Sequence, residues 1–130
     1  MTRRLLGIAA FLVALGGAVW AGTIVRDQLE GPGPVETVRI ATTAYARGDC
    51  EGLRAVSARP KAVECSAVRD VQRAYRDEGL KPAEFTFDLA TQDGSTAMVR
   101  ISYVSGGQPL SELVPVEKDG GDWRISEVSR

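Results

Sequence analysis

The sequence predicts an α+β protein in which an N-terminal transmembrane helix precedes three helices and a four-strand antiparallel meander. Three observations lead to this prediction. Residues 5–25 form a run without charge, residues 35–78 repeat apolar side chains at helical spacing, and residues 85–128 alternate apolar and polar side chains. Helices followed by strands indicate an α+β layered domain with its helices on one face of the sheet.

The apolar run at 5–25 follows directly after Arg3 and Arg4. As a helix it would reach about 31 Å, at roughly 1.5 Å per residue, which matches the hydrocarbon core of a bilayer. The arginines before it predict a single-pass protein of the cell membrane, with a cytoplasmic N-terminus and an extracytoplasmic domain. The alternative is a signal peptide that is cleaved after Val19-Trp20-Ala21, which would give a secreted protein.

The chain is expected to divide into a signal-anchor helix at 1–25, a Gly/Pro linker at 26–34 and one domain at 35–130. Gly31-Pro32-Gly33-Pro34 cannot be helical and would separate anchor from domain. All 17 acidic residues follow the anchor, together with 14 of the 16 basic ones, so residues 26–130 carry a formal charge of −3. Since no basic stripe or aromatic platform is present, we expect no nucleic-acid partner.

Three helices are predicted in the first half of the domain, over 35–47, 50–56 and 67–78. A glycine follows the first and the third, as is typical of helix ends, and Asp49 is suited to cap the second. Apolar spacing of three and four gives the first and third helices one buried face each. These faces comprise Val35, Val38, Ala41, Thr42 and Tyr45 in the first helix, and Val68, Val71 and Tyr75 in the third.

Four strands are predicted around 85–89, 96–104, 110–118 and 123–128, separated by glycine-containing hairpin turns. Pro115 lacks the amide donor of a strand residue and therefore predicts an edge or a bulge at its position. The inward-facing residues are expected to be Phe85, Phe87, Leu89, Ala97, Val99, Ile101, Tyr103, Leu110, Val114, Val116, Trp123 and Ile125, with Glu112 an exception among them.

Cys50 and Cys65 are the two cysteines of the chain, so they have one way to pair. An even cysteine count in an exported domain predicts a disulfide. It would close a loop of about 15 residues, for which chain entropy gives about 3 kcal/mol of stabilisation. A redox or metal pair is the alternative, but the spacing is too wide for a CxxC motif and the chain has no histidine to complete a zinc site.

Three features resemble small exported or membrane-anchored proteins of the NTF2-like (cystatin-like cone) superfamily of actinobacterial type. They are the first-helix segment Ala41-Thr42-Thr43-Ala44-Tyr45-Ala46-Arg47-Gly48-Asp49-Cys50, the paired Cys65 before a helix, and the closing Gly121-Asp122-Trp123-Arg124-Ile125. The resemblance covers about 35–128 and implies a cone of three helices packed on the meander. An early β-hairpin is missing, so the cone would be a trimmed version. The function of such proteins is mostly unassigned.

Enzymes of this superfamily, such as ketosteroid isomerases and scytalone dehydratase, use an Asp or His base with Tyr or acidic partners inside the cone. The chain has no histidine, and no apolar pocket identifies Asp88 or Glu112 as a buried base. We therefore predict no catalytic residue, no cofactor and no metal. We expect the space between helices and sheet to be lined by Tyr45, Phe85, Phe87, Tyr103 and Trp123.

These observations favour a membrane-anchored extracytoplasmic binding or interaction module, whose partner is an envelope protein or a small apolar ligand. A small isomerase or dehydratase is one alternative, and a structural role in a larger envelope complex is another. The cavity should discriminate between them. One of at least about 300 Å³ with a single inward carboxylate would favour the enzyme, whereas filling by Phe85, Phe87, Trp123 and Tyr45 would favour the interaction module.

Overall fold

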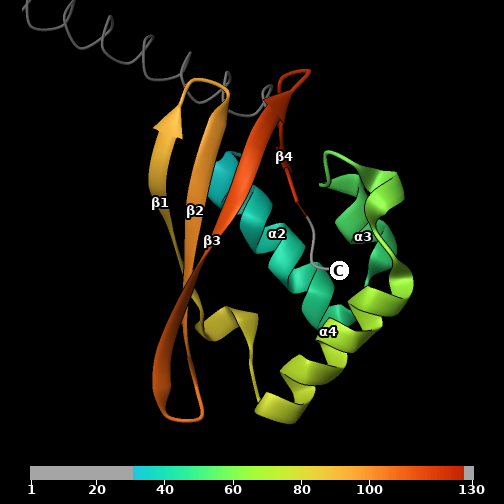
Figure 1. The fold of residues 1–130 in the computed structure, drawn as a ribbon, viewed down its shortest axis with the longest axis vertical. Helices are drawn as coiled ribbons and strands as arrows, with labels where there is room; N and C mark the ends of the chain where they lie inside the picture. The colour runs from blue at the N-terminus through green and yellow to red at the C-terminus, as the bar shows by residue number, and fades with distance from the viewer. Residues whose placement is uncertain (1–30, 128–130) are drawn as a thin grey trace, which may run out of the picture. The chain divides into compact units, whose positions relative to one another are not determined.

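The computed structural model describes residues 31–127, in which three α-helices precede a four-strand sheet (Figure 1). The helices are α2 (Pro34–Arg47), α3 (Cys50–Ala55) and α4 (Cys65–Glu78), and two short 3-10 helices, η1 (Pro60–Ala62) and η2 (Pro82–Glu84), lie in the connections. The strands are β1 (Thr86–Asp93), β2 (Thr96–Ser105), β3 (Gln108–Asp119) and β4 (Asp122–Ile125).

The predicted fold class included a transmembrane helix, and this part of the prediction is wrong. Within residues 31–127, no helix is long and apolar enough to cross a membrane. The longest, α2 and α4, have 14 residues each, or about 21 Å at ~1.5 Å per residue, which is short of a bilayer core. The run at 5–25, on which the prediction rested, lies outside the described residues. The structure supports an α+β domain of three helices and a four-strand antiparallel sheet.

The sheet is an antiparallel meander with strand order β1-β2-β3-β4. Its inward face follows the predicted alternation along β2, where Ala97, Val99 and Ile101 are buried. In the edge strand β1, the register with β2 shifts only after Leu89, which still pairs with the buried Val99. Leu89, which was predicted to face inward, is 42% exposed.

Pro115 lies in the inner strand β3, and no bulge interrupts its pairing with Met98 of β2. Its carbonyl accepts a hydrogen bond from the Ser126 amide at 2.9 Å, so its nitrogen also faces the β4 side. The ladder with β4 has ended there, at Ile125. The missing amide therefore costs no ladder hydrogen bond. Strand β4 has four residues against the twelve of β3, and it ends before it reaches Pro115.

The core lies between α2 and the sheet. Helix α2 packs against all four strands, and α4 packs on α2; Figure 1 shows α2 running across the face of the sheet. Spacing of three and four along α2 brings its apolar side chains to this interface. The buried apolar residues are Val38, Ala41, Ala44, Leu53, Val63, Val68, Ala97, Val99, Ile101, Val116 and Ile125.

The segment that follows α3 covers the outer edge of β4. The Ile125 amide donates to the Val56 carbonyl at 2.7 Å, and the Ala58 amide donates to the Ile125 carbonyl at 2.9 Å. Ser57 thereby forms a parallel bridge with Ile125. Pairing of this kind protects a strand edge that would otherwise be open to another chain. The sequence did not predict it, because it joins residues almost 70 positions apart.

Candidate functional site

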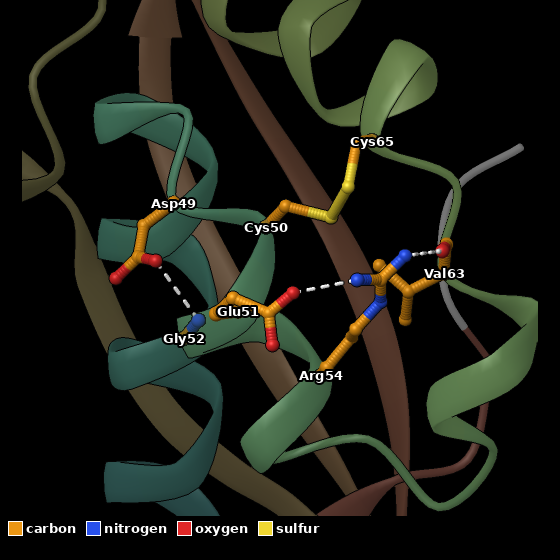
Figure 2. A network of polar contacts seen from close by, with 7 residues as sticks. All are labelled: Asp49, Cys50, Glu51, Gly52, Arg54, Val63 and Cys65. Carbon is orange, nitrogen blue, oxygen red and sulfur yellow. Dashed lines mark hydrogen bonds and ion pairs between the residues drawn. A yellow bond between two sulfur atoms is a disulfide. The ribbon is translucent and has the colours of Figure 1, made fainter.

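The two cysteines form a disulfide, as predicted. It joins the first residue of α3, Cys50, to the first residue of α4, Cys65, with a Cα–Cα distance of 5.3 Å (Figure 2). Both thiols are consumed, so neither is a nucleophile or a metal ligand. Within residues 31–127, no group of three Cys, Asp or Glu side chains is placed to hold a metal ion.

The surroundings of this disulfide are those of a structural connection. The Asp49 carboxylate accepts a hydrogen bond from the Gly52 amide at 2.9 Å and caps α3. Arg54 donates to Glu51 at 2.6 Å and to the Val63 carbonyl at 3.3 Å, which ties α3 to the loop before α4. Figure 2 shows these contacts beside the bridge.

A cleft of about 450 Å³ opens between α2, α4 and the facing parts of β2 and β3. Helix α4 packs chiefly on α2, and its side chains line the cleft opposite those of the sheet; Ile125 of β4 and Glu127 beyond it complete the wall. The apolar part of the wall comprises Val38, Ala41, Val71, Ala74, Leu80, Ile101, Leu113, Val114, Pro115 and Ile125. The polar part comprises Thr42, Tyr45, Tyr75, Tyr103, Glu78, Glu112 and Glu127.

All three tyrosines of the chain line this cleft. The ring of Phe85 holds two of them in place: it stacks on Tyr103 with centroids 4.9 Å apart, and Tyr75 meets it edge-on at 6.0 Å. These are favourable geometries for aromatic pairs. The rings of Tyr75 and Tyr103 are thus positioned by a neighbour from the start of the sheet.

The surroundings of the Tyr75 and Tyr103 hydroxyls raise their pKa values and so disfavour their ionisation. Burial raises the pKa of Tyr75 to about 12, and the negative charge of Glu112 adds to the effect. The pKa of Tyr103 is raised as well, by burial first and then by Glu112 and Glu78. Both causes oppose the charged phenolate. Both side chains are neutral at neutral pH, as a tyrosine with its ordinary pKa near 10 also is, and they stay neutral to a higher pH than a free phenol.

The carboxylates of Glu78, Glu112 and Glu127 are exposed at the cleft. Glu112 is opposite Ile101 in the β2–β3 register and so shares the inward face of the sheet with it. Glu78 accepts a long hydrogen bond of 3.5 Å from the Ser105 hydroxyl. None of the three carboxylates forms an ion pair with a residue in 31–127.

The predicted pocket residues do not all meet in this cleft. Tyr45 and Tyr103 line it, whereas Phe85 lines a neighbouring hollow of about 300 Å³ that shares Tyr103 in its wall. Phe87 and Trp123 line neither hollow. Phe87 lies under the Arg39 guanidinium, 5.2 Å from its ring centroid, and Trp123 packs against the core.

Tyr75 and Glu78 were not predicted to be site residues. They lie three positions apart on the last turn of α4, and this spacing was the one available signal that they share a face. Asp88, the other candidate acid, forms an exposed ion pair with Arg100 at 3.3 Å and is not part of the cleft.

The cleft matches neither of the two outcomes that were expected to discriminate function. Its volume exceeds about 300 Å³ and Glu112 lies on the inward face of the sheet, but the Glu112 side chain is exposed and two further carboxylates, Glu78 and Glu127, share the cleft. Of the four side chains expected to fill it, Phe85, Phe87 and Trp123 are not in its wall. The arrangement is an open, partly apolar cleft with tyrosine hydroxyls and an acidic rim.

The chain matches no protein-family model and no curated protein. A structural match is the solution structure of a SEC-C motif-containing protein from Rhodopseudomonas palustris, with a TM-score of 0.40 and 22% identity over 66% of this chain and 69% of that chain. A similarity this low supports no argument about function. None of these comparisons supports an assignment to the NTF2-like superfamily.

Proposed function

We propose that the domain is a non-catalytic binding module that holds a small, largely apolar molecule in the cleft between α2, α4 and the sheet. The observation that carries this proposal is the cleft itself. Its volume of about 450 Å³ falls within the roughly 300–1,000 Å³ that is typical of small-molecule sites.

The composition of the wall supports the same function. Apolar side chains from both helices and from the sheet, among them Val71, Ile101 and Val114, would cover the body of a ligand. A few polar groups that could orient it, the tyrosine hydroxyls, stand among them. Ten of the seventeen lining residues are apolar, and ligand sites typically combine apolar side chains with placed polar groups.

The raised pKa values of Tyr75 and Tyr103 argue against a role for these two hydroxyls in acid–base catalysis. A general acid or base works best when its pKa lies near the working pH. Burial and Glu112 move the pKa of Tyr75 in the opposite direction, to about 12. The carboxylates are exposed and so lack the apolar surroundings that prepare a buried base.

The disulfide supports a location outside the cytosol. A Cys50–Cys65 bridge persists in an oxidising compartment and is rare where glutathione and thioredoxin keep thiols reduced. We propose that the domain meets its ligand in the cell envelope or in the surrounding medium.

Titration of the whole protein with the neutral fluorescent probe N-phenyl-1-naphthylamine tests this function. Ala74 is exposed in the wall of the cleft, so Ala74→Trp should place an indole in it without disturbing the core. We expect the variant to lose at least roughly tenfold in probe affinity, about 1.4 kcal/mol, which corresponds to ~55 Å² of apolar burial.

Ala55→Trp is the matched control, because Ala55 is an exposed alanine of helix α3 and lies outside the cleft. It should bind the probe as the wild type does. Equal affinity of Ala74→Trp and wild type, or no binding of the probe to wild type, would contradict the proposal. Circular dichroism of both variants would establish that the fold is unchanged.

A further inference from the structure

We propose that the ligand of this cleft is an organic cation, an ammonium group on an apolar body. This inference rests on the proposed function and names the chemical class of the ligand. Its first support is the sign of the charge: the charged side chains among the described residues that line the cleft are Glu78, Glu112 and Glu127, with no lysine or arginine among them. An anionic ligand would meet three carboxylates and no counter-charge, whereas a cation is attracted by all three.

The aromatic lining is a second and independent support. Tyr45, Tyr75 and Tyr103 contribute three ring systems to one cleft. The negative face of an aromatic ring attracts a cation within about 6 Å of the ring centroid, and aromatic cages recognise quaternary ammonium ligands in this way. Phe85 contacts two of these rings, so they are positioned before a ligand arrives and less side-chain entropy is lost on binding.

Glu112 belongs both to the acidic side chains of the cleft and to the surroundings of its tyrosines. It is a carboxylate on the inward face of β3, between Leu110 and Val114 and opposite Ile101. It lines the same cleft as Tyr75 and Tyr103, and its charge contributes to the raised pKa of both. With residues 31–127 it makes no side-chain hydrogen bond or ion pair that would explain its position in the fold.

A metal ion is a poorer fit than an organic cation. Divalent ions need several oxygen ligands converging on one point, and the described residues contain no such group of three acidic side chains. The carboxylates instead stand around an opening whose walls include Val71, Leu80 and Val114. Such a wall suits the hydrocarbon part of an amine or quaternary ammonium compound.

Calorimetric titration of the whole protein with three probes of equal chain length tests the inference: octyltrimethylammonium and octanoate, each far below its micellar concentration, and octanol, below its solubility limit. We expect octyltrimethylammonium to bind roughly fivefold to tenfold more tightly than octanol, as one ring face and one exposed carboxylate would provide. Octanoate should bind most weakly. The preference for the cation should fall as salt is raised, because the carboxylates are exposed.

Two matched variants test whether the preference for the ammonium probe arises in this cleft. Glu112→Gln should lower the affinity for octyltrimethylammonium roughly twofold to fivefold and leave that for octanol unchanged. Glu117→Gln makes the same change on the same strand, outside the cleft, and should alter neither affinity.

The possible results separate this inference from the proposed function. Octanol binding as tightly as the ammonium probe would overturn the cation preference and leave an apolar binding site intact. No binding by any of the three probes would overturn both. An equal effect of Glu112→Gln and Glu117→Gln would show that the preference comes from net charge, and would overturn the assignment to this cleft.

Discussion

Replacing both cysteines with alanine should lower the free energy of unfolding by about 3 kcal/mol. Cys50 and Cys65 are separated by 15 positions. The chain-entropy relation for a loop of that length gives about 10 cal/mol/K, or ~3 kcal/mol at 25 °C. The native contacts inside the loop should survive the change, because the loss acts mainly by giving the unfolded chain more freedom.

Several contacts would hold the loop in place without the bridge. Arg54 reaches the Val63 carbonyl, and Val56 and Ala58 pair with Ile125 through the backbone. A domain of this size has a stability of about 5–15 kcal/mol, so a loss near 3 kcal/mol leaves a folded protein. We therefore expect the Cys50→Ala/Cys65→Ala variant to keep its secondary structure.

Urea denaturation followed by far-ultraviolet circular dichroism measures the effect. With a slope of about 1–2 kcal/mol per molar, the midpoint should fall by roughly 1.5–3 M relative to the oxidised wild type. Wild type reduced by dithiothreitol is the control and should behave like the variant. A difference below about 1 kcal/mol between oxidised and reduced protein would refute the loop-closure reasoning.

Three further predictions concern stability. Val99 has no exposed surface, so Val99→Ala should lower the free energy of unfolding by about 2 kcal/mol, because it leaves a cavity. Leu110 is 44% exposed, so Leu110→Ala should lower it by under about 1 kcal/mol. Equal losses in urea denaturation would mean that the core is misassigned. Asp49→Ala removes the cap on the Gly52 amide and should cost about 1 kcal/mol in the same assay, while no loss would show that the cap is unimportant. The folded protein binds the Tyr75 proton more tightly than the unfolded chain, whose phenol has a pKa near 10, so this contribution to stability is complete below pH 10 and is lost as pH rises to about 12. Tyr75→Phe should flatten the fall in stability over that window, and an unchanged pH profile would contradict the burial of this hydroxyl.

The helices were predictable because their signals are local. The first was predicted over 35–47 and extends over Pro34–Arg47, with Gly48 in the left-handed conformation at its end. Asp49 caps the second helix as predicted. The third begins at Cys65, two residues before the prediction, and lacks a side-chain cap that could have marked its start.

The candidate site was only partly predictable, because its members come from separate elements. Tyr45 and Tyr103 were identified, but Tyr75 was assigned to a buried helix face. Glu112 was visible as an exception to the strand pattern. Its significance depends on residues of other elements that line the same cleft, such as Tyr75 on α4, and no pattern within β3 contains that information.

The sequence by itself determined the order of helices and strands, the turn positions, the disulfide pairing and the alternation along β2, because each depends on neighbouring residues or on there being two cysteines to pair. Only the tertiary structure decided that Pro115 lies beyond the end of the β4 ladder, that the segment after α3 covers the edge of β4, and that a cleft remains between α4 and the sheet. Those features depend on strand length and on packing distances between elements far apart in the chain. Side-chain volumes and long-range hydrogen bonds set these distances, and local periodicity does not encode them.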